Sequence, residues 1–143
     1  MLRFLVVDDH LGTTSALREL LESDGHRVQA CHSGRDALKA LSRSEFDVVL
    51  TDWELLEVSG EAVASAAREQ QPHACLVVSS GRVHLPIAGG VCHVFGKPLD
   101  YETFERTVLA CRAHAGPGRN GRCYLRETSL PDPSGVDPPL WRR

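Results

Sequence analysis

Short apolar runs alternate with stretches of helical periodicity along most of this chain, and this alternation limits the possible folds more than any other feature. The runs expected to form strands are Leu2–Val7, His26–Cys31, Asp47–Thr51, Ala74–Ser79 and Val91–Phe95. Runs of this length suit buried strands, and strands that alternate with helices form a parallel sheet covered by helices on its faces. The sequence therefore predicts an α/β fold.

The stretches between the runs carry helix start and stop signals. The helices expected are Leu11–Ser23, a helix begun by Ser33, Ser59–Gln70, and a helix capped by Asp100 that ends near Ala115. Gly25 is a C-terminal stop for the first of these helices, and Pro72 ends the third. Ser33 and Asp36 have the spacing of a capping box.

The segment Ser80–Gly90 breaks the alternation. A crossover between parallel strands normally takes about a dozen residues or more, usually with a helix. This segment is shorter and contains Pro86, which lacks a backbone N–H and clashes with a preceding helical turn. We therefore expect the helix at this place to be shortened or missing. A signal from the site would then act by shifting this segment between ordered and disordered states.

Composition divides the chain of 143 residues into two parts. Residues 116–143 hold five of the eight prolines and four of the twelve glycines, without periodicity. Such composition favours a flexible tail. Residues 1–115 are therefore expected to form one domain, which is long enough to bury a core.

Charge and cysteine content exclude several classes of protein. The net charge is −3, and residues 1–115 carry the acidic excess, which argues against direct binding to nucleic acid. The five cysteines have no paired Cys-x-x-Cys spacing, as expected in a reducing compartment. The first apolar run is too short for a signal peptide or a membrane span. A cytoplasmic location without membrane insertion is the prediction.

Charged side chains stand at the ends of three of the runs. Asp8 and Asp9 follow the first run, Asp52 follows the third, and Lys97 follows the fifth. The carboxyl ends of parallel strands share one edge of the sheet, where ligands bind. Three acids and one base are therefore expected in one pocket, suited to a divalent cation and a phosphate-like group.

These motifs together resemble the response-regulator receiver domain of bacterial two-component signalling, over residues 1 to about 115. The matching motifs are Phe4–His10, Asp52 with Gly60 eight residues later, Ser79 after Cys75–Val78, and Lys97-Pro98. The resemblance implies a doubly wound, five-stranded parallel sheet of the flavodoxin-like type, with strand order 2-1-3-4-5.

The resemblance also implies a role for each acid. Asp52 would be the phospho-acceptor. Mg²⁺ would be the cofactor, bound by Asp9, Asp52 and the backbone carbonyl of Glu54, with Asp8 holding it through water.

Two further residues receive roles by the same resemblance. Lys97 would pair with Asp52 at rest and with a phosphoryl oxygen afterwards, aimed inward by a cis peptide before Pro98. Ser79 would donate its hydroxyl to another phosphoryl oxygen, although the sequence leaves Ser80 open as the alternative.

Some positions depart from the family pattern. Ser79 replaces a commoner threonine, Leu56 replaces a usual proline, and Val94 stands where a switch aromatic is usual. These departures leave the phosphorylation pocket complete but weaken the usual output surface.

The function predicted is a phospho-acceptor switch that takes its phosphoryl group from a sensor histidine kinase or a phosphotransfer protein. It would catalyse only its own phosphorylation and dephosphorylation, and would therefore not be an enzyme in the ordinary sense. No DNA-binding domain is recognised after Ala115, so output by contact with another protein is expected. The alternative is a receiver-like interaction module that works without phosphorylation. A hydrolase of the doubly wound class fits poorly, because Glu54 stands where such enzymes need a second Asp.

Overall fold

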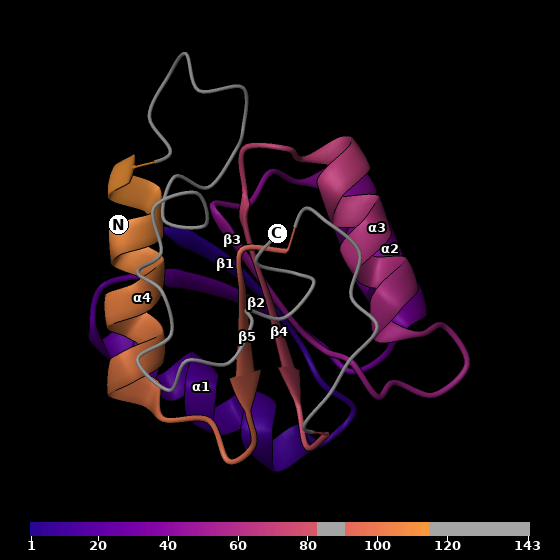
Figure 1. The fold of residues 1–143 in the computed structure, drawn as a ribbon, viewed down its shortest axis with the longest axis horizontal. Helices are drawn as coiled ribbons and strands as arrows, with labels where there is room; N and C mark the ends of the chain where they lie inside the picture. Colours follow the sequence, from indigo (N-terminus) through magenta and orange to yellow (C-terminus); the bar gives the residue numbers. More distant parts are fainter. Residues whose placement is uncertain (83–90, 115–143) are drawn as a thin grey trace, which may run out of the picture.

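The computed structural model describes residues 1–82 and 91–114. The elements, in chain order, are β1 (Arg3–Val7), α1 (Leu11–Ser23), β2 (Arg27–Cys31), α2 (Gly34–Arg43), β3 (Val48–Asp52), α3 (Gly60–Gln70), β4 (Cys75–Ser80), β5 (His93–Gly96) and α4 (Tyr101–His114). Figure 1 shows them as a central sheet between two layers of helices.

The five strands form one parallel sheet in the order β2-β1-β3-β4-β5, which confirms the predicted fold. β3 lies at the centre, flanked by β1 and β4. Asp52, the last residue of β3, stands opposite Ser79 of β4 in the register. The carboxyl ends of the three central strands therefore meet at one place.

Alternation along each strand builds a separate core on each face of the sheet. Leu5 and Val7 of β1 face α2 and α3, whereas Phe4 and Val6 belong to the core beneath α1 and α4. Successive strand residues point to opposite faces, and both faces of this sheet are covered. Because both faces are buried, the central strands are apolar along most of their length and do not alternate with polar residues.

The helix signals predicted from the sequence are present in the structure. The hydroxyl of Ser33 accepts the N–H of Asp36 at 3.1 Å, and that of Ser59 accepts the N–H of Ala62 at 3.1 Å. Gly25 has a φ of 88°, the left-handed conformation that glycine adopts most readily.

The strand boundaries differ from the predicted ones by one or two residues. His26 was predicted to begin a strand, but its Nδ1 accepts the N–H of Leu2 at 3.1 Å, and the ladder begins at Arg27. β5 begins at His93 and not at Val91. Tertiary pairing, which a local pattern does not contain, fixes these ends.

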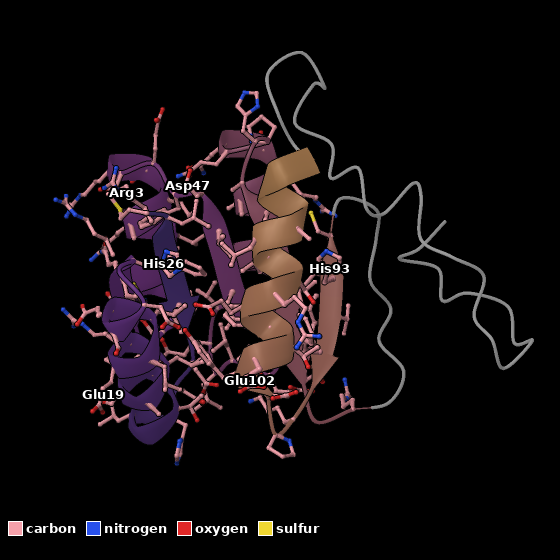
Figure 2. The ribbon with its side chains drawn as sticks, turned by 90° about the vertical axis from the view of Figure 1, so that its left-hand side faces the viewer. Arg3, Glu19, His26, Asp47, His93 and Glu102 are labelled. Atoms are coloured by element: carbon pink, nitrogen blue, oxygen red, sulfur yellow. The ribbon has the colours of Figure 1, made fainter. Side chains whose placement is uncertain are left out.

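Figure 2 shows α4 lying across the sheet, with Arg3 and Asp47 at the amino edge and Glu102 near the carboxyl edge. Within the described ranges, no helix is both long and apolar enough to cross a membrane. Most of the irregular segment before β5 (residues 83–90) and the tail (116–143) lie outside the described residues, so the predictions about them stay predictions.

Candidate functional site

The predicted acids meet at the carboxyl edge of the sheet. Asp8 directly follows β1, and Asp52 ends β3. Oxygen atoms of Asp8, Asp9 and Asp52 lie within 4.8 Å of one another. Asp8 and Asp52 are buried, whereas Asp9 is exposed. Three carboxylates this close supply the hard oxygen ligands that Mg²⁺ prefers.

The loop after β1 holds Asp8 in place. The backbone N–H of His10 donates to Asp8 Oδ1 at 2.9 Å. His10 is also the N-cap of α1, where its Nδ1 accepts the N–H of Thr13 at 3.2 Å. One residue therefore positions both the acid and the beginning of the helix.

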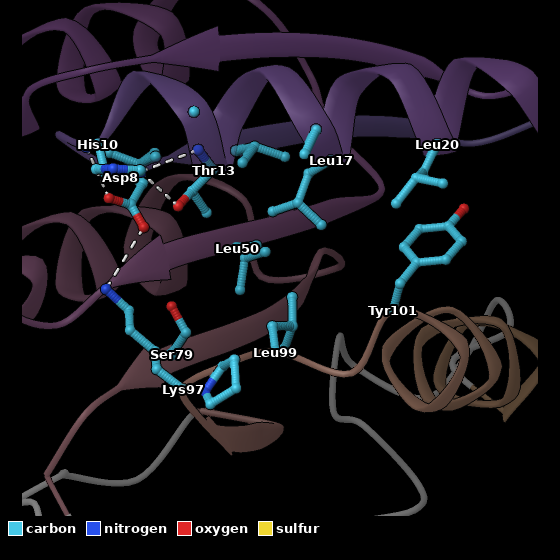
Figure 3. A pocket seen from close by; sticks show the side chains of 15 residues that line it. Asp8, His10, Thr13, Leu17, Leu20, Leu50, Ser79, Lys97, Leu99 and Tyr101 are labelled. Carbon is cyan, nitrogen blue, oxygen red and sulfur yellow. Dashed lines mark hydrogen bonds and ion pairs between the residues drawn. The ribbon is translucent and has the colours of Figure 1, made fainter.

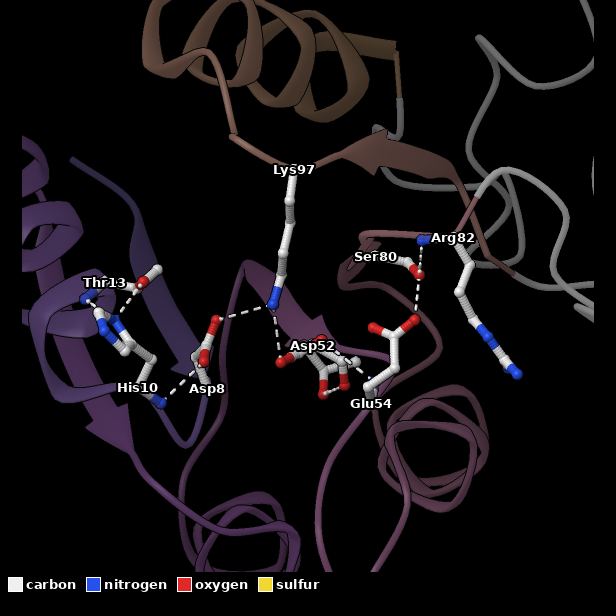
Figure 4. A network of polar contacts seen from close by, with 9 residues as sticks. Asp8, His10, Thr13, Asp52, Glu54, Ser80, Arg82 and Lys97 are labelled. Carbon is white, nitrogen blue, oxygen red and sulfur yellow. Dashed lines mark hydrogen bonds and ion pairs between the residues drawn. The ribbon is translucent and has the colours of Figure 1, made fainter.

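Lys97 reaches across the edge to two of the acids, as Figure 4 shows. Its Nζ lies 2.8 Å from Asp52 Oδ2 and 3.5 Å from Asp8 Oδ2. The peptide bond from Lys97 to Pro98 is cis, as the family resemblance implied. The backbone N–H of Lys97 donates to the carbonyl of Ser80 at 3.0 Å, which continues the pairing of β5 with β4.

Burial and charge act in opposite directions on Asp52. Desolvation raises the pKa of this carboxyl above its usual value, although the hydrogen bond from Lys97 lowers it in part. Burial would lower the pKa of Lys97, but the hydrogen bond and charge of Asp52, with the charge of Asp8, raise it overall. The lysine is therefore held as a cation beside a carboxylate that is poorly solvated.

The structure gives the two serines at the end of β4 different surroundings. Ser79 stands opposite Asp52 in the sheet register and lines a cavity together with Asp8 and Lys97. Ser80 instead donates its hydroxyl to the carboxylate of Glu54 and accepts the N–H of Arg82 at 2.9 Å. The geometry therefore favours Ser79 over Ser80 as the hydroxyl nearest the site of Asp52, Asp8 and Lys97.

Glu54 contributes to the site through its backbone and its side chain. Its N–H donates to Asp52 Oδ1 at 3.1 Å. Burial alone would raise the pKa of the Glu54 carboxyl, but the hydroxyl of Ser80 and further hydrogen bonds lower it. The carbonyl of Glu54 remains a predicted metal ligand.

A cavity of about 560 Å³ opens beside the acids, between α1 and the beginning of α4 (Figure 3). Asp8, Ser79 and Lys97 line its polar end. Leu17 and Leu99 are among the apolar side chains that line the rest. The cavity provides an apolar surface next to a charged group.

The sequence is similar to a known family over most of its length. The family model described as the response regulator receiver domain matches residues 4–94. The chain belongs to the response regulator receiver family. This receiver is 29% identical over 115 residues to the transcriptional regulatory protein ZraR of Escherichia coli strain K12, covering 77% of this chain and 26% of the relative. It is 43% identical to the virulence sensor protein BvgS of Bordetella pertussis over 67 residues, covering 47% of this chain and 5% of the relative.

The chain spans only about a quarter of the length of the ZraR proteins that it matches. Solved receiver structures show the same fold over more of their length. A CheY-like receiver domain from Methanospirillum hungatei aligns with a TM-score of 0.74 at 18% identity, covering 79% of this chain and 94% of the other. The response regulator TrrA of Thermotoga maritima, solved in complex with Mg²⁺ and beryllofluoride, aligns with a TM-score of 0.69 at 25% identity, covering 76% and 97%.

The sequence did not predict every polar group near this receiver's site. The bond between Ser80 and Glu54 depends on the pairing of β4 with β3, which brings together residues 26 positions apart. His10 gave no capping signal, because histidine is not among the residues preferred at that position.

Proposed function

We propose that residues 1–115 form a phospho-acceptor switch in which Asp52 takes a phosphoryl group from a histidine of a partner kinase or phosphotransfer protein. The observation that supports this most is the ion pair between the buried Asp52 and the partly exposed Lys97, which stands among carboxylates suited to Mg²⁺. The chain would change only its own phosphorylation state and would pass the signal on by contact with another protein, in the cytoplasm.

In the reaction proposed, a carboxylate oxygen of Asp52 attacks phosphorus, an O–P bond forms, and the N–P bond of the partner histidine breaks. The electron pair of that bond stays on the imidazole nitrogen, which takes up a proton. The ammonium group of Lys97 moves from the carboxylate of Asp52 to a phosphoryl oxygen. Ser79 donates its hydroxyl to a second phosphoryl oxygen. Phosphoryl transfer depends mainly on such positioning and charge stabilisation.

Asp9, Asp52 and the backbone carbonyl of Glu54 are the ligands proposed for Mg²⁺, with Asp8 holding the ion through water. When bound, Mg²⁺ supplies positive charge that neutralises the phosphoryl oxygens. Asp8 and Lys97 are themselves in contact, so the lysine and the ion would share the negative charge of this edge.

The donor histidine must reach the carboxyl edge, and the cavity lined by Leu17 and Leu99 lies next to it. We therefore expect the partner to approach over α1 and the beginning of α4. Protein interfaces usually combine an apolar centre with a polar rim.

One observation favours the second candidate, a receiver-like interaction module that works without phosphorylation. Val94 is half-buried and stands opposite Val78 in the pairing of β4 with β5, at the position where the family resemblance leads us to expect an aromatic side chain. A valine has no ring to rotate between two positions, so the usual readout of phosphorylation is weakened.

Binding of a phosphoryl mimic distinguishes the two candidates. With Mg²⁺ present, beryllofluoride should bind at Asp52 and give a bound signal in fluorine NMR, which Asp52→Asn should abolish. Asp47→Asn changes a carboxylate that accepts the N–H of Arg3 at the opposite edge, so it should leave the signal unchanged. No bound signal in the wild-type chain would reject the switch and favour the module.

A further inference from the structure

Three cysteine side chains from three different elements meet inside the molecule, away from the carboxyl edge. Cys75 begins β4, Cys92 directly precedes β5, and Cys111 lies near the end of α4. Their sulfur atoms lie within 4.8 Å of one another. Each of the three side chains is at most 5% exposed. The fold thus concentrates thiols that are widely spaced in the sequence.

We propose that Cys75, Cys92 and Cys111 form an all-sulfur, three-coordinate site for one thiophilic ion. An ion at the centre of three such atoms would lie at most about 2.8 Å from each, and a metal–sulfur bond is about 2.3 Å long. Closing the site therefore needs shifts of about half an ångström. Soft sulfur ligands select soft ions over the hard cations that the carboxylates prefer.

The donor set limits the coordination number. Among the residues that the structure describes, no histidine or carboxylate joins the three sulfurs as a further ligand. Zn²⁺ usually takes four ligands, so it is a poor match for this set. Cu(I) and trivalent arsenic are both satisfied by three sulfurs.

The surroundings limit the charge of the loaded site. The three cysteines belong to the apolar core beneath α1 and α4, with Val77, Phe104 and Val108. Burying net charge in such surroundings is costly. Arsenite meets this condition: three S–H bonds and three As–O bonds break, three As–S bonds form, three waters leave, and the product is neutral. With Cu(I), the loaded site is neutral only if one thiol loses its proton and the other two keep theirs.

The place of the cluster in the fold gives the expected consequence. Cys75 begins β4 and Cys92 directly precedes β5, and these two strands lead to Ser79 and Lys97 at their other ends. Figure 2 shows the two edges at opposite ends of the strands. A bound ion would tie α4 to both strands and raise the melting temperature.

The test uses the full chain, reduced and free of oxygen, titrated separately with arsenite and with Cu(I) buffered by a chelator. Native mass should show one ion per chain, and X-ray absorption should show three sulfur neighbours. Cys75→Ala, Cys92→Ala and Cys111→Ala should each weaken binding at least about tenfold, since the loss of a residue that only supports a metal ligand already costs about that much.

A fourth described cysteine, Cys31, serves as the matched control. Cys31 is buried outside the cluster, and burial raises the pKa of its thiol to about 11. Because Cys31 lies outside the cluster, Cys31→Ala should bind the ion as the wild type does. Asp52→Asn should also bind it normally, because the thiol site does not depend on the proposed phospho-acceptor.

A measurement on the wild-type chain covers the case in which an alanine variant fails to fold. Under mild denaturation, the loaded chain should resist alkylation at the three clustered cysteines, while Cys31 reacts. The proposal is overturned if neither ion binds, if protection does not follow the cluster, or if Zn²⁺ binds most tightly with a nitrogen or oxygen ligand.

Discussion

Asp52 is a buried carboxylate whose charge costs free energy in the folded state, and Lys97 offsets only part of that cost. The side chain of Asp52 is 3% exposed, and desolvation is the main reason for the raised pKa of its carboxyl group. As the proposed nucleophile, Asp52 would be poorly solvated but held by a cation that can move to the incoming phosphoryl group.

The raised pKa of Asp52 predicts the pH dependence of one variant. The unfolded carboxyl titrates near 3.8, and the folded one titrates higher, so stability from this group is lost as pH rises from 3.8 through the folded pKa. Without Mg²⁺, Asp52→Asn should therefore melt at a higher temperature than the wild type at pH 7. The difference should shrink towards pH 4, and Asp9→Asn, which changes an exposed carboxylate, should show a smaller effect. A lower melting temperature for Asp52→Asn at pH 7 would contradict this account.

The two serines at the end of β4 provide a second prediction at this scale. Ser79→Ala should slow phosphorylation by acetyl phosphate about tenfold or more, because a hydrogen bond to a charged group is worth about 1.5–3 kcal/mol. Ser80→Ala removes the bond to Glu54 and should change the rate much less. Quenched time courses followed by intact mass measure both rates, and the reverse order would assign the role to Ser80.

At the scale of elements, the junction of β3 with α3 holds Asp52 in place. Gly60 begins α3, and a Cβ added there would lie 2.1 Å from the carbonyl oxygen of Asp52. The helix can therefore approach the end of the strand only because this residue has no side chain. The spacing of Asp52 and Gly60 in the sequence has a direct steric reason.

Gly60→Ala should destabilise the fold by about 1–3 kcal/mol, the usual cost of overpacking, and should slow phosphorylation by displacing Asp52. Gly81→Ala is the matched control, since a Cβ there meets no atom within 4 Å. Chemical denaturation measures both variants. Equal stability of the two would show that the junction relaxes without cost.

The elements were predictable from the sequence because apolar runs and capping residues are local signals. Leu11–Ser23 was predicted with its observed bounds, and Ser33 begins its helix as expected. Ser79 was predicted over Ser80 only by counting the apolar residues before it, and the sequence does not contain the register that sets Ser79 opposite Asp52. The meeting of Cys75, Cys92 and Cys111 depends on the packing of α4 and has no local signal at all.

At the scale of the whole molecule, the same strands have different chemistry at their two ends. Carboxylates and a lysine gather at the carboxyl edge, and thiols gather towards the amino edge. Repulsion among the carboxylates favours a bound cation.

Mg²⁺ should stabilise the whole domain through this edge. At a hundredfold excess over its dissociation constant, a ligand that binds only the folded state adds about 2.7 kcal/mol. The melting temperature should rise with millimolar Mg²⁺, and emission of Trp53, the residue after Asp52, should change. Asp9→Ala should remove both responses. If neither signal responds in the wild type, the assignment of the metal site is wrong.

The central claim is that Asp52 accepts a phosphoryl group, and intact mass tests it most directly. After incubation with acetyl phosphate and Mg²⁺, the wild-type chain should gain the mass of one phosphoryl group, which acid or hydroxylamine treatment should remove. Asp52→Asn should gain none, and neither should the wild type after chelation of Mg²⁺. An unchanged wild-type mass at saturating donor, or an equal gain in Asp52→Asn, would contradict the account.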